Sequence, residues 1–368
     1  MKFQSLANQF VCDVPVYEPG RPIEEVAREL GLNPKSVIKL ASNENPLGPS
    51  PKAVAAMRKA LASSHLYPDG GGFYLRRALA KKLSCEIDNI VLGTGSNEII
   101  EFLYHAFVGP GDEIIAGDRA FVIYSIMAKM FQARCVEVPF RGHTHDLKAM
   151  LAAITPKTKL VFVANPNNPT GTRVTNAELE DFIRRLPAHV IAVLDEAYIE
   201  FLDDPPPSIT WALEHNVVVL RTFSKIVGLA GLRIGYGVAQ KECIALLQRV
   251  RQPFNTNAIA QAGALAALDD TAHIRKTKTV TRRGLAHLYR EFKRLKLEYV
   301  PSCANFVLVN VGNGDEIFWG LQRRGVIVRP MRGYKMPGWV RVTVGTMEEN
   351  RRFVGALKQE LGGVATKS

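Results

Sequence analysis

The chain has 368 residues, which is long enough to bury a large core and to form a large domain with a smaller one. Hydrophobic residues make up 47% and charged residues 22%, as in soluble globular proteins, and no apolar run approaches the length of a membrane span. The net charge of +12 comes from basic residues dispersed along the chain, so it is no specific sign of nucleic-acid binding. An anionic small substrate accounts for the charge equally well, since positive potential steers anions toward a cleft.

The N-terminus and the cysteines bear on location. The first ten residues lack a continuous apolar segment and a small-residue cleavage site, so we expect no export. The cysteines are far apart and form no Cys-x-x-Cys pair, which argues against a disulfide framework and against a zinc site. We therefore expect a cytoplasmic protein without a metal ion, acting on small molecules and not on nucleic acid or membranes.

The first part of the chain is predicted as an arm that leads into helices. Prolines interrupt it up to about residue 37, apart from a short helix over 23–30. The elements that follow are a strand turning into a polar loop at 39–49, a helix at 51–61, a glycine loop at 67–72 and a helix at 73–83.

From residue 89 to 220, short apolar strands alternate with amphipathic helices. The strands are predicted at 90–92, 113–116, 135–138, 160–163, 190–194 and 217–220, and the helices at 96–108, 121–131, 147–154 and 176–186. Near-continuous apolar strands separated by helices indicate a mostly parallel sheet covered on both faces. Ligands bind such sheets at the carboxyl ends of the strands, where the candidate motifs fall.

The last third is predicted to be helical up to about residue 295, with a break near Pro253, and then to form a smaller α+β unit. Strands are expected near 306–311, 326–329 and 340–344, and helices near 315–324 and 348–361. The predicted division is an N-terminal arm with part of the small domain over 1–40, a large domain over 41–270, and a small domain with its linking helix over 271–368.

Two polar residues follow buried strands. Asp195 ends the strand before it, where an ionised carboxylate needs a cation or a donor, such as a pyridinium nitrogen. Asn168 lies in a turn that Asn-Pro and Thr-Gly steps enforce, and its amide could donate to a ligand oxygen at the sheet edge. A helix-capping aspartate and a purely structural turn are the alternatives.

Two glycine loops precede helices. Residues 92–98 run from a strand into a helix start, where backbone N–H groups and the helix dipole bind phosphate. The loop lacks the third glycine of Gly-x-Gly-x-x-Gly and the Lys-Ser/Thr of a P-loop, so neither nucleotide motif is present. The glycine loop at 67–72 precedes the helix at 73–83, and a flexible connection is the structural interpretation of it.

Residues 222–236 form a loop with hydroxyls at Thr222 and Ser224, one lysine, glycines and an arginine. Lys225, at a strand end among apolar residues, can become a nucleophilic amine by desolvation, and a solvated lysine is the alternative. Arg341 lies in an apolar strand, where a buried guanidinium calls for a carboxylate partner, internal or from a substrate. Phe121 could stack on a ligand ring or belong to the core.

In their order and spacing these motifs resemble those of the fold-type I pyridoxal-phosphate aminotransferases, and within them the histidinol-phosphate branch. The resemblance covers almost the whole chain, from Tyr17 to the last helix. Its most specific pieces are 167–171, 195–198, 222–225 with Arg233, and 341–346, and two further ones, 43–48 and 67–70, are typical of that branch. It implies a mostly parallel mixed sheet in a large domain, a smaller α+β domain, pyridoxal 5'-phosphate as the cofactor, and a homodimer with shared active sites.

The resemblance also implies roles at the cofactor ring. Lys225 matches the Schiff-base lysine that also moves the substrate proton, and Asp195 matches the residue that keeps the pyridine nitrogen protonated. Tyr198 and Asn168 match donors to the phenolic oxygen of the ring. Phe121 stands where the family usually has a stacking tyrosine, so stacking is retained and any role of the hydroxyl is lost.

For the cofactor phosphate, the resemblance implies contacts from the helix start and the lysine loop, namely Gly95, Ser96, Asn97, Thr222, Ser224 and Arg233. Tyr67 matches a tyrosine that reaches the cofactor phosphate of the other subunit. Arg341 matches the arginine that receives the substrate carboxylate or phosphate, with Arg329 as a second anion contact. Tyr17 resembles a tyrosine on the arm that closes over the partner's substrate.

The reaction that the resemblance implies is transamination between L-histidinol phosphate or imidazole-acetol phosphate and glutamate or 2-oxoglutarate, in histidine biosynthesis. An aromatic-amino-acid aminotransferase needs the same cofactor residues and is the nearest alternative. A threonine-phosphate decarboxylase is another. A non-catalytic aminotransferase-like sensor would carry a helix-turn-helix module, for which no stretch of this sequence is left over.

Overall fold

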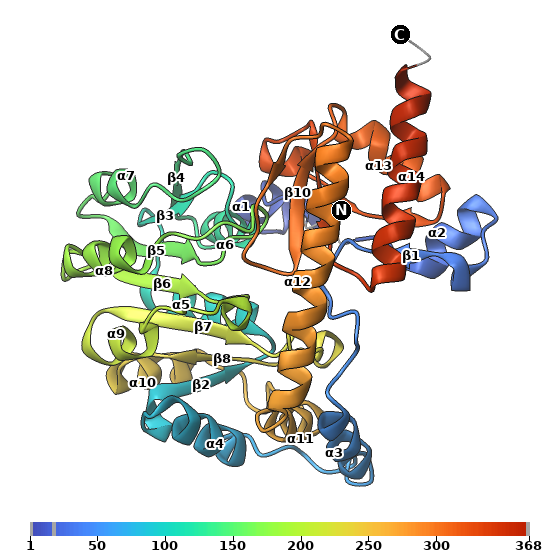
Figure 1. Cartoon of the computed structure of the whole chain (residues 1–368). Helices are drawn as coiled ribbons and strands as arrows, with labels where there is room; N and C mark the ends of the chain where they lie inside the picture. The colour runs from blue at the N-terminus through green and yellow to red at the C-terminus, as the bar shows by residue number, and fades with distance from the viewer. Residues whose placement is uncertain (1–2, 17–19, 366–368) are drawn as a thin grey trace.

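We describe the fold from a computed structural model, which describes residues 3–16 and 20–365 (Figure 1). The α-helices are α1 (Gln9–Cys12), α2 (Ile23–Leu30), α3 (Pro51–Leu61), α4 (Phe73–Leu83), α5 (Ser96–Phe107), α6 (Ile123–Met130), α7 (Leu147–Ala152), α8 (Asn176–Arg184), α9 (Ser208–Glu214), α10 (Lys241–Val250), α11 (Ala258–Ala267), α12 (Thr271–Arg294), α13 (Gly314–Arg323) and α14 (Met347–Ala365). The 3-10 helices are η1 (Phe3–Ser5), η2 (Pro34–Ser36), η3 (Ile87–Asn89), η4 (Ile199–Phe201), η5 (Ala230–Leu232) and η6 (Arg332–Tyr334).

The strands form three sheets. They are β1 (Ile38–Lys39), β2 (Ile90–Gly93), β3 (Glu113–Gly117), β4 (Arg134–Val138), β5 (Thr158–Ala164), β6 (Ile191–Asp195), β7 (Val217–Thr222), β8 (Gly235–Val238), β9 (Tyr299–Val300), β10 (Phe306–Asn310), β11 (Val326–Ile327), β12 (Arg329–Pro330) and β13 (Trp339–Thr343).

The largest sheet has the order β2-β8-β7-β6-β5-β3-β4, and its paired strands are parallel except at β8, which is antiparallel to both neighbours. Its strands are apolar on both faces, because helices cover both. On β5, Val161 and Val163 face one core cluster while Leu160 and Phe162 face the other, as the two-residue period of a strand requires. The predicted mostly parallel mixed sheet is confirmed.

The C-terminal part forms a smaller antiparallel sheet of order β12-β13-β10-β9. Near it, β1 pairs in parallel with β11, matching Ile38 with Val326, so the early chain lies beside the C-terminal part. The helix α12 runs from beside α11 at the large sheet to the small sheet, where it packs on β10 and α14 (Figure 1). The domain boundaries at 40/41 and 270/271 stay predictions.

One strand of the large sheet was missed by sequence reasoning. We expected the lysine loop to extend to Tyr236 and a helical region to follow it, but residues 235–238 form β8 between β2 and β7. Two of its four residues are glycines, which depress the strand signal. Gly235 is needed there, since a Cβ atom would lie 2.6 Å from the Ser96 nitrogen and 2.8 Å from the Arg221 oxygen. The helix break near Pro253 is confirmed by the gap between α10 and α11.

Candidate active site

One cavity gathers the candidate residues from both parts of the fold. It opens where β5, β6 and β7 end and faces strands β12 and β13 of the small sheet. Of the predicted site residues, those that line it are Gly95, Ser96, Asn97, Phe121, Asn168, Asp195, Tyr198, Thr222, Ser224, Lys225, Arg233, Arg329 and Arg341. Because parallel strands end at one edge of a sheet, side chains far apart in sequence converge there.

Asp195 ends β6 and is only 6% exposed. Its Oδ2 accepts a hydrogen bond of 2.7 Å from the Tyr124 hydroxyl, and its Oδ1 accepts one of 3.2 Å from the Ala197 nitrogen. Burial raises the pKa of this carboxyl, and the two hydrogen bonds oppose the shift. Tyr124, on α6, was missed by sequence reasoning because a tyrosine within an apolar helix gives no signal of its partner.

Lys225 lies in the loop after β7. Its Nζ lies 3.3 Å from the Ser42 carbonyl oxygen and 5.6 Å from the centre of the Tyr198 ring. The hydroxyl of Tyr198 accepts a hydrogen bond of 2.9 Å from the Asn43 amide. Burial raises the pKa of Tyr198, and the charge of Arg341 opposes the shift. The amine and the phenol therefore share one end of the cavity.

The glycines of the lysine loop differ in what they permit. Gly228 has a φ of +78°, and a Cβ atom there would lie 2.2 Å from the Gly48 carbonyl oxygen. Gly231 has open space around it. Both glycines lie between Lys225 and Arg233, in the part of the loop that returns Arg233 to the site. Only Gly228 carries a backbone conformation and a close approach that demand glycine.

We expect Gly228→Ala to lower the free energy of unfolding by about 2 kcal/mol or more, because the alanine meets both strain and the Gly48 backbone. Gly231→Ala is the matched control and should change it by less than about 0.5 kcal/mol. Urea unfolding of both variants measures the difference. Equal changes in the free energy of unfolding would show that the close approach of Gly228 to Gly48 does not require a glycine.

The start of α5 and the lysine loop form an anion-binding cup. Gly95 precedes the helix with a φ of +75°, and a Cβ atom there would lie 2.6 Å from Nη2 of Arg233. The Thr222 hydroxyl donates to the Ser224 hydroxyl at 2.9 Å, and Nη1 of Arg233 lies 3.5 Å from that same oxygen. A helix N-terminus, two hydroxyls and a guanidinium suit a phosphate group.

The opposite side of the cavity carries two arginines on neighbouring strands. Arg341 of β13 and Arg329 of β12 are directly paired in register. Arg341 is 7% exposed and donates to Oδ1 of Asn168 and to the Ala41 carbonyl. Its partners thus include a side-chain amide and a backbone carbonyl. Tyr334, at the end of η6, also lines the cavity and carried no recognisable sequence signal.

One predicted residue lies outside the cavity, and another is not among the described residues. Tyr67 does not line the described cavity; it is 83% exposed and stacks on Phe254 with ring centres 4.8 Å apart. Tyr17 lies outside the described residues. The roles of all the predicted site residues, including a contact from Tyr67 to a second subunit, stay predictions.

A lysine and an aspartate at neighbouring strand ends, beside a cup for an anion, place this fold among the aminotransferase-like α/β proteins. The chain belongs to the family described as aminotransferase class I and II, which matches residues 35–357. It is 50% identical over 363 residues to the histidinol-phosphate aminotransferase of Akkermansia muciniphila, covering 98% of this chain and all of the relative. It is 49% identical over 359 residues to that of Moorella thermoacetica, covering 96% of this chain and 92% of the relative.

Solved structures agree on the fold. The crystal structure of histidinol-phosphate aminotransferase from Sinorhizobium meliloti in complex with pyridoxal-5'-phosphate superposes with a TM-score of 0.90 at 27% identity, covering 98% of both chains. An aspartate aminotransferase double mutant from Thermus thermophilus superposes with a TM-score of 0.83 at 27% identity, covering 96% of this chain and 99% of that one. The predicted fold-type I architecture is therefore confirmed.

Proposed function

We propose that the chain is a pyridoxal-phosphate-dependent histidinol-phosphate aminotransferase that acts in histidine biosynthesis. The observation that carries the proposal is the shared cavity, in which Lys225, Asp195 and the anion cup face the paired Arg329 and Arg341. The similarity to histidinol-phosphate aminotransferases over nearly the full chain supports the same substrate.

The residues present fit the cofactor. The cup of Gly95, Ser96, Thr222, Ser224 and Arg233 would hold the phosphate of the cofactor. Asp195 lines the same cavity and would meet the ring nitrogen there. Asp195, fixed by Tyr124 and the Ala197 nitrogen, would hold a proton on the ring nitrogen. When bound, pyridoxal phosphate supplies a carbonyl that condenses with amines and a ring that withdraws electrons from the substrate Cα.

The protein side chains then provide binding and proton transfer. In the first half-reaction, Lys225 Nζ would remove the proton from the Cα of the amino donor. In the second half-reaction it would deliver a proton to the Cα of the newly formed amine. The hydroxyl of Tyr198 and the amide nitrogen of Asn168 would donate to the phenolic oxygen of the cofactor. Because Oδ1 of Asn168 accepts from Arg341, the amide nitrogen is the group that remains to donate to a ligand.

Both substrates carry an anion, and Arg341 and Arg329 would bind it. Glutamate presents a carboxylate and histidinol phosphate presents a phosphate, and the planar fork of a guanidinium matches either anion. The Asn168 and Ala41 contacts hold the Arg341 guanidinium in place before a substrate enters. The substrate amine is thereby oriented toward Lys225.

We expect Arg341→Gln to raise the KM for both glutamate and histidinol phosphate by about tenfold to a hundredfold, since a charged hydrogen bond is lost from each complex. Steady-state kinetics with each substrate varied in turn measures the change. Arg184→Gln, on the exposed side of α8, is the matched control and should leave both constants unchanged. An unchanged KM for both substrates in Arg341→Gln would remove Arg341 from the substrate site.

The protein is proposed to work as a homodimer. Five large apolar side chains are exposed, namely Leu66, Tyr67, Phe73, Tyr74 and Phe254. Among them, Tyr67 stacks on Phe254, and Phe73 packs edge-on against Tyr74. Exposed apolar side chains of this kind mark an interaction surface.

A cytoplasmic location is proposed from the five unpaired cysteines. Among the helices of the described residues, none has the length and apolar character needed to cross a bilayer.

Assays with glutamate as the donor and a panel of keto acids test the proposed reaction. Imidazole-acetol phosphate should have a far higher kcat/KM than phenylpyruvate, because the second substrate lacks the phosphate that the two arginines would bind. A preference for phenylpyruvate would favour the aromatic-amino-acid alternative. Release of carbon dioxide from an amino-acid phosphate would favour a decarboxylase.

A further inference from the structure

The segment between α10 and α11, residues 251–257, lies behind the anion cup and contacts the turn that precedes α5. Nδ2 of Asn255 donates to Oε2 of Glu98 and lies 3.3 Å from the Leu92 carbonyl oxygen. The same Glu98 oxygen accepts a hydrogen bond of 2.7 Å from the Thr94 nitrogen. The backbone carbonyl of Asn255 accepts the Thr94 hydroxyl at 2.7 Å. Thr94 is therefore held through both its backbone and its side chain.

The contacts of Glu98 and Asn255 with Thr94, here called the clamp, set the position of the cup. Thr94 directly precedes Gly95, whose N–H and those of the next residues start α5. Arg233 lies close to Gly95, where a Cβ atom would be 2.6 Å from its Nη2, and Glu98 and Asn255 hold the preceding Thr94. Without the clamp, a turn with a glycine at positive φ would have conformational freedom. The clamp therefore reduces the conformational entropy that the turn loses when it binds an anion.

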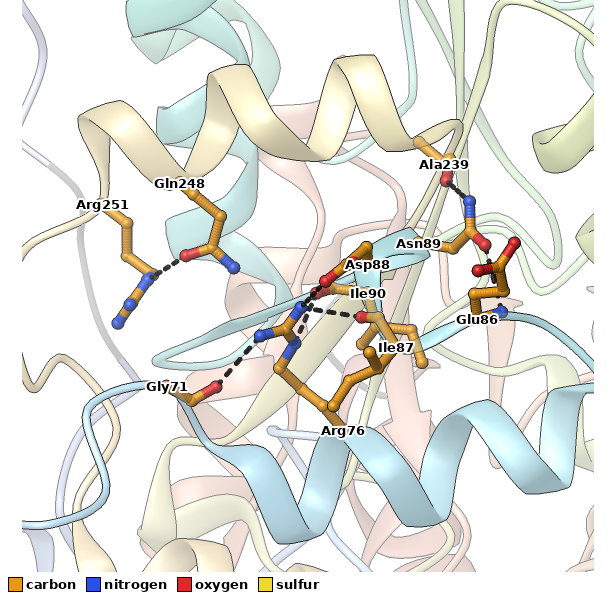
Figure 2. A network of polar contacts seen from close by, with 10 residues as sticks. All are labelled: Gly71, Arg76, Glu86, Ile87, Asp88, Asn89, Ile90, Ala239, Gln248 and Arg251. Atoms are coloured by element: carbon orange, nitrogen blue, oxygen red, sulfur yellow. Dashed lines mark hydrogen bonds and ion pairs between the residues drawn. The ribbon is translucent and has the colours of Figure 1, made fainter.

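The charge of Glu98 would oppose a phosphate at the same helix start, and the charge of Arg251 offsets it. Nη1 of Arg251 donates to Oδ1 of Asn255 at 2.8 Å, while its Nε donates to Gln248 at 2.7 Å. Burial and the nearby charge of Arg76 lower the pKa of Arg251, and Glu98 raises it. Figure 2 shows Arg251 held by Gln248 and Arg76 reaching the carbonyl oxygens of Gly71, Ile87 and Ile90.

Phe254, the residue before Asn255 in the segment 251–257, contacts the loop that carries Tyr67. Phe254 stacks on Tyr67, and the Gly70 Cβ position would lie 3.1 Å from the Phe254 ring. Nε2 of Gln261, on α11, bridges the Asp69 and Thr256 carbonyl oxygens at 3.0 Å each. Consecutive residues, Phe254 and Asn255, thus contact the Tyr67 loop and the anion cup.

We propose that Asn255, together with Glu98, is a positioning residue for the cofactor phosphate: it holds the Thr94–Gly95 turn in the conformation that binds the anion. The inference rests on the proposed function, since it assigns the cup to the phosphate of pyridoxal phosphate. The side chain of Asn255 acts through the Glu98 carboxylate, which accepts from the Thr94 nitrogen, and through the Leu92 carbonyl oxygen. Among the described residues, Asn255 does not line the cavity.

The test measures cofactor affinity in the purified full-length protein. Asn255→Ala should raise the Kd for pyridoxal phosphate by about tenfold, the effect of losing hydrogen bonds worth about 1.4 kcal/mol. It should leave the Kd for pyridoxal, which lacks the phosphate, unchanged. Absorbance titration of apoprotein with each compound gives both constants without an activity assay.

Asn89→Ala is the matched control. Asn89 is an asparagine whose side chain hydrogen-bonds to the Glu86 nitrogen and the Ala239 oxygen (Figure 2), directly before β2, and within the described part of the chain it makes no hydrogen bond to the residues of the cup. It should lower the urea midpoint and leave the Kd for pyridoxal phosphate unchanged. Glu98→Gln keeps an acceptor for Thr94 and should retain affinity.

Three results would overturn the inference: an unchanged Kd for pyridoxal phosphate in Asn255→Ala, an equal loss of affinity for pyridoxal, or an equal loss in Asn89→Ala. A wild-type protein that binds neither compound would instead overturn the proposed function and, with it, this inference. A wild-type protein that binds pyridoxal phosphate, with Asn255→Ala unaffected, overturns the role of Asn255 alone.

Discussion

Lys225→Ala is expected to lower the rate of transamination by about a thousandfold or more, the largest effect of any single substitution in the cavity. The lysine would serve both as the covalent anchor of the cofactor and as the base at the substrate Cα, and general acid–base catalysis alone contributes about 10²–10⁴-fold. The Nζ position, close to the Ser42 carbonyl and the Tyr198 ring, leaves the amine facing the cavity.

Stopped-flow measurement of the half-reaction with glutamate tests this expectation, together with the absorbance of the bound cofactor near the visible edge. Lys129→Ala, an exposed lysine on α6, is the matched control and should retain both the rate and the spectrum. A Lys225→Ala protein that keeps the wild-type rate would contradict the mechanism. Loss of the rate with an unchanged wild-type spectrum would separate the proton-transfer role from the anchoring role.

Asp195→Asn is expected to lower kcat/KM by about a hundredfold to a thousandfold. The substitution keeps the size of the side chain and an oxygen to accept from Tyr124, while it removes the charge that would hold a proton on the ring nitrogen. Without that proton the ring withdraws electrons from the substrate less strongly. Tyr124→Phe, which removes one hydrogen bond to the carboxylate, should give a smaller decrease.

The same substitution should make the protein without cofactor more stable at neutral pH. Burial raises the pKa of Asp195 above its value in the unfolded chain, so the folded state binds more protons than the unfolded state between those two pKa values. Stability therefore falls as the pH rises through that interval, and Asp195→Asn removes this loss. Urea unfolding of the apoproteins at several pH values measures it; a less stable Asp195→Asn apoprotein at neutral pH would contradict the expectation.

Local patterns in the sequence predicted most elements of the large sheet. Apolar runs of strand length between amphipathic helices indicated β2 to β7, and the polar residues after them, Asn168, Asp195 and Lys225, indicated the site. Helices α2, α3 and α4 begin and end at the predicted residues. Proline or glycine marks the start of each, and Gly31 marks the end of α2. These signals lie within a few residues of the features that they predict.

What the sequence by itself determined is therefore the order of elements, the strand ends that carry polar groups and, through its motifs, the family. Only the tertiary structure decided which distant residues support them: Tyr124 on Asp195, Asn43 on Tyr198, Asn168 on Arg341, and Asn255 on Glu98. Each pair is separated by at least 71 positions. Such contacts depend on how strands and helices pack, and the periodicity that specifies a single element carries no information about its partner.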